Sequence, residues 1–269
     1  MKWDLLFGII ILGLIFLWTI YQLLKSIKYR KEKSFTSIQF LFHVLTLFYC
    51  IARIFWLSLQ QRKNNWVVFQ FSINRFAILS FFTSFTLLVF FWAQIYHNLL
   101  SKMSSLKTVH VVLNSLLYIY TIICIILFGT GVEKDTDNNP FYDVNVLIIA
   151  GVSVCTSLAF FVYGFLLMRK YGESVFHSNK KRHLLKIFSI TILYSACFLL
   201  RFIMFLYRPI TGKYFPYTYY IFFFYYVPEI PPIVVQLWTM KIKTGLKKNN
   251  KQINAKLIEE ESFTSSSST

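Results

Sequence analysis

The sequence predicts an all-α membrane protein: a seven-transmembrane helix bundle with its N-terminus outside or luminal and its C-terminus in the cytosol. Three observations lead to this fold class. Hydrophobic residues make up 56% of the 269 residues, aromatic residues make up 20%, and the apolar residues occur in long runs. A soluble core of this size cannot bury so much apolar surface. Phe, Tyr and Trp also suit lipid-facing surfaces and the membrane interface.

Seven apolar runs are long enough to cross a bilayer, since about 20 helical residues span a hydrocarbon core of roughly 30 Å. The runs are continuous rather than alternating, which favours helices over a barrel, because each helix satisfies its own backbone hydrogen bonds in lipid. Residues 1–240 therefore form one domain. The predicted spans are approximately 5–24, 36–59, 77–100, 109–129, 143–168, 184–206 and 217–240.

The first span is expected to remain as an anchor, because its basic cluster, 25–33, follows the apolar run, whereas a signal peptide carries basic residues before a shorter run. Lys and Arg are also concentrated in 101–108, in 169–186 and in the tail after residue 240. These segments connect alternate ends of the spans, and basic segments resist translocation, so they are predicted to be cytosolic. Arg75 is assigned to the sparser basic residues of the opposite side.

The formal net charge of +17 follows largely from these loops. Such a charge favours contact with anionic lipids of the cytoplasmic leaflet. A nucleic-acid partner is not indicated. The tail, residues 241–269, changes from basic to acidic and Ser-rich, and we expect it to be a disordered cytosolic segment.

Three ionisable residues lie within the second, sixth and seventh spans: Arg53, Arg201 and Glu229. A charged side chain near the centre of a membrane span costs about 2.5–3.5 kcal/mol on insertion scales, so such residues are expected to have charged or hydrogen-bonding partners. Glu229 lies near mid-depth in the proline-rich stretch VPEIPP, where prolines remove backbone donors and kink the helix. We expect Glu229 to pair with an arginine. Two interpretations are retained: the pair fixes the register of the helices, or it belongs to a functional polar cavity.

The third span ends in a crowded polar group at its predicted cytosolic end. One interpretation is hydrogen bonding to neighbouring helices, worth about 0.6 kcal/mol per bond. The other is a docking surface for a partner, or a switch in helix packing. A stripe that includes Thr83, Thr86 and Phe90 is predicted to face the bundle. The polar group consists of Trp92, Gln94, Tyr96, His97 and Asn98.

No cofactor or metal is indicated. All four cysteines fall within spans, which favours structural thiols, and there is no H-E-x-x-H motif and no G-x-S-x-G motif. The acidic loop 131–143 misses the calcium-loop spacing and is interpreted as a solvated turn. We therefore predict that the protein is not an enzyme. The cysteines are Cys50, Cys124, Cys155 and Cys197.

Two stretches carry a family resemblance. TSFTLLVFFWAQIYH (83–97) and YYVPEIPPIVVQLW (225–238) resemble the third and seventh helices of the plant tobamovirus-multiplication protein family. The chain departs from that family at Gln94, where an acidic residue is usual. The resemblance implies a seven-helix scaffold in a vacuolar, lysosome-like or other endomembrane, with small Arf-like GTPases among the partners. A related animal group of orphan-receptor-like lysosomal membrane proteins implies the same kind of role.

The function predicted from these observations is a non-enzymatic endomembrane scaffold that recruits cytosolic partners through its basic loops and the end of the third helix. A G-protein-coupled-receptor-like receptor is one alternative, although the chain lacks the acidic-Arg-Tyr and Asn-Pro-x-x-Tyr motifs. A proton-coupled transporter that uses Glu229 is the other.

Overall fold

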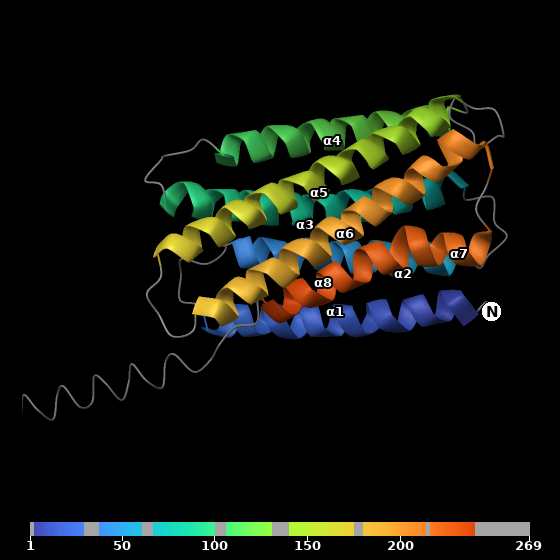
Figure 1. The fold of residues 1–269 in the computed structure, drawn as a ribbon. Coiled ribbons are helices and arrows are strands. Elements are labelled where there is room, and N and C mark those ends of the chain that lie inside the picture. The colour runs from blue at the N-terminus through green and yellow to red at the C-terminus, as the bar shows by residue number, and fades with distance from the viewer. Residues whose placement is uncertain are drawn as a thin grey trace, which may run out of the picture. The chain divides into compact units, whose positions relative to one another are not determined.

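The computed structural model describes residues 3–29, 38–60, 67–99, 106–130, 140–174, 180–213 and 216–239, and these are almost entirely helical (Figure 1). Seven of the helical segments in this part of the chain are long and apolar enough to cross a membrane. The predicted tail, 241–269, and loop residues 131–139 lie outside the described residues. The elements are α1 (Trp3–Tyr29), α2 (Ile38–Leu59), α3 (Val67–Leu99), α4 (Leu106–Gly129), α5 (Pro140–Ser174), α6 (Lys180–Thr211), α7 (Tyr217–Ile221), the π-helical turn η1 (Phe222–Tyr226) and α8 (Val227–Thr239).

Successive spans run in opposite directions, so the bundle has two ends (Figure 1). We call the end where α1 begins the amino-terminal end. The other is called the basic end, because it carries Lys25 and Lys28 of α1 and Arg169 and Lys170 of α5. By the predicted topology, the basic end is cytosolic.

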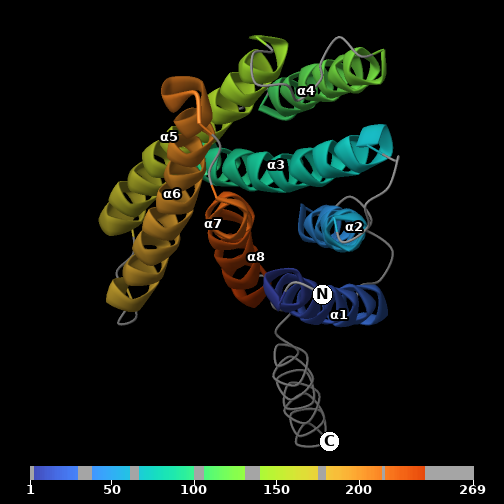
Figure 2. The same cartoon turned by 90° about the vertical axis from the view of Figure 1, so that its right-hand side faces the viewer.

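The helix α3 occupies the centre of the bundle and packs against α2, α4 and α5 (Figure 2). Its buried face carries Phe81 and Phe85, whose rings contact Phe198 at centroid distances of 5.5 and 5.4 Å. Of the seven spans, α3 is the most buried and α4 the least. The core is therefore an aromatic layer around α3, while α4 lies at the periphery.

The third span begins earlier than predicted, and this changes the position of Arg75. The apolar run starts near residue 77, but α3 starts at Val67, because Asn74 and Arg75 interrupt the run without interrupting the helix. Arg75 is buried and lies about 12 Å along the helix from Val67, at 1.5 Å per residue. The predicted start of the third span, near residue 77, was therefore wrong, and Arg75 lies inside the helix, toward the amino-terminal end of the bundle.

The helices α5 and α6 approach each other closely through small residues. Ser157 Oγ donates a hydrogen bond to the Ser195 carbonyl at 2.8 Å, and Ser195 Oγ donates to the Ser157 carbonyl at 3.2 Å. A Cβ built at Gly164 would overlap Oγ1 of Thr191 and would lie 2.9 Å from the Thr191 Cβ. Small residues allow such packing in membranes, where dispersion and hydrogen bonds replace the hydrophobic effect between helices.

Candidate functional site

The backbone around Glu229 is shaped by the prolines of the seventh span. Pro228 and Pro231 cannot donate backbone hydrogen bonds, and the π-helical turn η1 lies directly before them. The Val227 N–H bonds to the Phe222 carbonyl across this turn. Pro231 leaves the Val227 carbonyl without its usual helical donor, and Cys197 Sγ donates to that carbonyl at 3.8 Å. A thiol of α6 thus satisfies a carbonyl that the proline frees.

The Glu229 carboxylate is the centre of a buried charge cluster. Its Oε1 accepts hydrogen bonds from Arg53 Nη2 and from Arg201 Nη1, both at 2.7 Å. Its Oε2 accepts a hydrogen bond from the Tyr49 hydroxyl at 2.6 Å. The exposed fraction of Glu229 is 1%. Both oxygens of one carboxylate are therefore occupied by donors from α2 and α6.

The Arg53 guanidinium has partners on most of its surface. Its Nη1 donates to the Asn74 Oδ1 at 2.7 Å, and its Cζ lies 4.4 Å from the centre of the Tyr225 ring and 5.2 Å from that of Trp56. Aromatic faces stabilise cations, most strongly where water is absent. Arg53 therefore connects α2 to α3, η1 and α8.

The Arg201 guanidinium is less well satisfied. Its exposed fraction is 0%, and its only hydrogen bond within the described residues is the one to Glu229. Its Nε and Nη2 have no hydrogen-bond partner there. Instead, its Cζ lies 5.0 Å from the centre of the Phe82 ring and 5.1 Å from that of Phe81. Two arginines share one glutamate, so the cluster carries one excess positive charge.

Sequence reasoning missed two polar members of this cluster, Tyr49 and Asn74. A signal for Tyr49 was present, because it precedes Arg53 by four residues and so lies on the same helix face. Asn74 fell outside the predicted third span. The arrangement ties together four helices, and a substrate could reach the carboxylate only if one of these contacts broke.

The members of the polar group at the end of α3 have different contacts. Trp92 packs into the bundle, with its ring centre 5.6 Å from that of Phe160 and 6.4 Å from that of Tyr194. Gln94, Tyr96 and His97 are partly exposed, and Tyr96 contacts His97 edge-on at 5.5 Å. The side chain of Asn98 lies outside the described residues.

The predicted stripe on α3 faces α4. Thr86 Oγ1 donates to the Asn114 Oδ1 at 3.3 Å, and the Phe90 ring lies 4.9 Å from His110. Thr83 Oγ1 lies 3.5 Å from the Tyr118 hydroxyl. These contacts attach the peripheral α4 to the centre of the bundle.

The basic end presents a mixed basic and aromatic surface. Lys186 of α6 is exposed, and its Nζ lies 5.4 Å from the centre of the Trp238 ring. The exposed fraction of Trp238 is 61%. Lys28 and Arg169 are also exposed at this end. An exposed Trp beside a cation can contact a lipid interface or an acidic partner.

A metal-hydrolase arrangement is not present in the part of the chain that the structure describes, where no group of three or more His, Cys, Asp or Glu side chains could hold a metal ion. The four cysteines are free thiols, three of them buried.

A model of the THH1/TOM1/TOM3 domain matches residues 3–255 of the chain. This match contains all seven spans and the whole charge cluster. No solved structure gives a significant match.

Curated plant relatives match a shorter region. Tobamovirus multiplication protein 1 of Nicotiana tabacum is 33% identical over 127 residues, and that of Arabidopsis thaliana is 32% identical over 130 residues. Tobamovirus multiplication protein 3 of Nicotiana tabacum is 29% identical over 136 residues. These alignments cover 45%, 46% and 47% of the chain, and 41%, 41% and 42% of the respective relatives, so the chain spans less than half of each relative's length.

Proposed function

The chain belongs to the THH1/TOM1/TOM3 domain family of integral multi-pass membrane proteins, and on this premise we propose that it is a non-enzymatic scaffold that recruits a cytosolic partner. The proposed partner is a small Arf-like GTPase, and the proposed location is a vacuolar, lysosome-like or other endomembrane. The curated relatives are named for tobamovirus multiplication, which is a process and not a reaction. A scaffolding role accords with such a name.

The observation that carries the proposal is the exposed surface at the basic end. Lys186 and Trp238 are held together there on two different helices, and the partly exposed Tyr96 and His97 at the end of α3 lie at the same end of the bundle. Aromatic and basic side chains on rigid helices are typical of binding hot spots, where a few residues carry most of the affinity. Anionic lipids of the same leaflet would also contact this surface.

Recruitment can be measured with the full chain in lipid nanodiscs and with purified Arf-like GTPases in their GTP-bound and GDP-bound forms. We expect nucleotide-dependent binding. The double variant Lys186→Glu/Trp238→Ala should bind at least about tenfold more weakly, since truncation of a hot-spot residue costs 2 kcal/mol or more. Gln94→Leu/His97→Leu tests the end of α3 in the same assay.

The matched control is Lys213→Glu/Trp3→Ala, which changes an exposed lysine and an exposed tryptophan at the amino-terminal end. This control should bind the GTPase as the unchanged chain does. Equal loss in both double variants, or equal binding of all forms, would contradict the proposed surface. Ion flux in proteoliposomes that disappears in Glu229→Gln would instead assign the protein as a transporter.

A further inference from the structure

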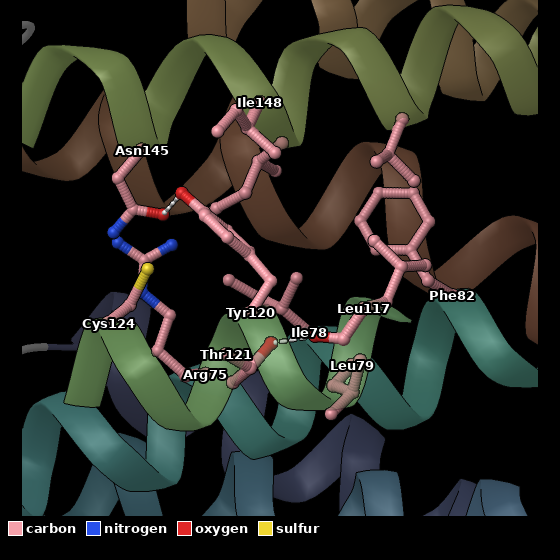
Figure 3. A pocket seen from close by; sticks show the side chains of 12 residues that line it. Arg75, Ile78, Leu79, Phe82, Leu117, Tyr120, Thr121, Cys124, Asn145 and Ile148 are labelled. Atoms are coloured by element: carbon pink, nitrogen blue, oxygen red, sulfur yellow. Dashed lines mark hydrogen bonds between the residues drawn. The ribbon is translucent and has the colours of Figure 1, made fainter. Parts of the chain in front are cut away.

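A third buried arginine, Arg75, takes no part in the Glu229 cluster and lines a cavity between α3, α4 and α5 (Figure 3). Arg75 has an exposed fraction of 8%, so it is more than nine-tenths buried. Its Nε has no hydrogen-bond partner among the described residues, and its Cζ lies 4.6 Å from the centre of the Phe71 ring. A buried charge of this kind is costly unless an opposite charge compensates it.

The cavity into which Arg75 extends has a volume of about 40 Å³. This is enough for a small oxyanion group, since one water needs roughly 10–15 Å³ by the same kind of measure. The Tyr120 hydroxyl donates to the Asn145 Oδ1 at 3.2 Å, which directs the NH₂ side of that amide away from Tyr120 (Figure 3). The guanidinium of Arg75 at this cavity presents donors in the planar pattern that carboxylate and phosphate groups accept.

Most of the remaining wall of the cavity is apolar. The apolar part includes Ile78 and Leu79 of α3, Leu117 of α4, and Ile148 and Val152 of α5. A free ion gains nothing from such walls. An amphiphile can place its anionic group at Arg75 and its hydrocarbon outside the cavity against Ile148, whose exposed fraction is 37%. The peripheral position of α4 leaves this region near the lipid.

Positive potential reaches the cavity from a second source. Phe82 lines the cavity, and the Arg201 Cζ lies 5.0 Å from the centre of the same ring. The excess positive charge of the Glu229 cluster therefore lies behind one wall of the cavity. Low-dielectric walls strengthen its effect on an anion.

We propose that this cavity, which we call the Arg75 pocket, binds the carboxylate or phosphate head group of a membrane lipid. The Arg75 guanidinium is the main donor, and the lipid chain lies outside the cavity, against the exposed face of Ile148. By the predicted topology, the lipid comes from the outer or luminal leaflet. The site is distinct from the basic end, which faces the other leaflet.

The experiment measures the thermal midpoint of the purified full chain in a neutral detergent while an amphiphile is titrated. The probes are oleate and dioleoyl phosphatidic acid, with oleyl alcohol as the neutral control and acetate and inorganic phosphate as the free-anion controls. We expect the two anionic lipids to raise the midpoint saturably, and we expect oleyl alcohol and the free anions to leave it unchanged.

The test variant is Arg75→Gln, and the matched control is Lys213→Gln, which removes an exposed cation. Arg75→Gln should bind the anionic lipids about 10- to 100-fold more weakly, as expected for loss of charge-assisted hydrogen bonds. It should keep or raise the midpoint without lipid, because an uncompensated charge has gone. Lys213→Gln should titrate as the unchanged chain does.

Three results would overturn the proposal. The first is equal titration of Arg75→Gln and the unchanged chain. The second is equal stabilisation by acetate or inorganic phosphate, which would make the site one for free anions. The third is a lower midpoint of Arg75→Gln without lipid that Asp143→Asn reproduces, since Asp143 lies two residues before Asn145 on α5. That result would make Arg75 a structural partner of Asp143.

Discussion

Removal of Arg201 is predicted to lower the free energy of unfolding much less than removal of the Glu229 charge. Glu229→Gln keeps the shape of the side chain but raises the charge of the cluster from one excess positive charge to two. Breaking a buried ion pair in this way costs about 3–5 kcal/mol. In a chain of this size about 1 kcal/mol shifts the thermal midpoint by roughly 2–4 °C, so the midpoint should fall by roughly 6–20 °C.

Removal of Arg201 has two opposing effects. Arg201→Met loses one hydrogen bond to a carboxylate, worth about 1.5–3 kcal/mol, and contacts with phenylalanine rings worth about 0.5–2 kcal/mol. It also removes a cation whose Nε and Nη2 lack hydrogen-bond partners within the described residues, and the penalty for such a buried ion is several kcal/mol. Glu229 keeps Arg53 and Tyr49 as donors. The midpoint should therefore change by less than about 4 °C.

The assay heats fluorescently tagged full-length protein in detergent and measures the fraction that remains monodisperse on size exclusion. Lys213→Met, at an exposed lysine, controls for the loss of a surface charge. The double variant Arg201→Met/Glu229→Gln restores one excess positive charge and should recover part of the loss seen in Glu229→Gln. If Arg201→Met lowers the midpoint as much as Glu229→Gln does, the excess-charge reasoning is refuted.

Two further predictions concern packing and buried polarity. Gly164→Ala should lower the midpoint, since its Cβ would overlap Thr191. Gly164→Ala/Thr191→Ala should restore it only in part, because the Cβ at position 191 would still lie 2.9 Å from the new Cβ. Gly151→Ala on the same helix meets nothing within 4 Å and should be neutral or stabilising; equal effects at the two glycines would contradict the close contact. Gln22→Leu should raise stability by about 1–3 kcal/mol, because both amide atoms of this fully buried side chain lack partners in the described residues. A loss of stability measured by thermal unfolding would show that Gln22 has a polar partner.

The sequence predicts the membrane spans because each span is recognised from a continuous run of apolar residues, without knowledge of its tertiary contacts. Long apolar runs identify the helices, and Arg53, Arg201 and Glu229 stand out because charges in such runs are rare. The start of α3 could not be read in this way. Arg75 and Asn74 break the apolar run, although a helix with its backbone bonded internally continues through polar residues when they face the bundle.

The partners of these residues depend on packing, which no periodicity specifies. Arg53 and Arg201 are almost 150 positions apart in the sequence, and their convergence on one carboxylate follows from how α2, α6 and α8 pack. The contact between Gly164 and Thr191 also depends on packing, because a glycine in a span does not by itself indicate which helix packs against it. For the end of α3, composition suggested one polar group, but Trp92 packs against Phe160 and Tyr194, whereas Tyr96 contacts His97.

The uncompensated charges raise a question that stability alone does not answer. Arg75 and Arg201 both have buried N–H groups without partners among the described residues. Phe82 lines the Arg75 pocket, and its ring also contacts Arg201. Each cation alone would be a cost. Together they lower the energy of an anion that enters the pocket, because both potentials act through low-dielectric surroundings. The Glu229 cluster then has two roles. Its contacts hold four helices together, and its excess positive charge favours anion binding in the neighbouring Arg75 pocket.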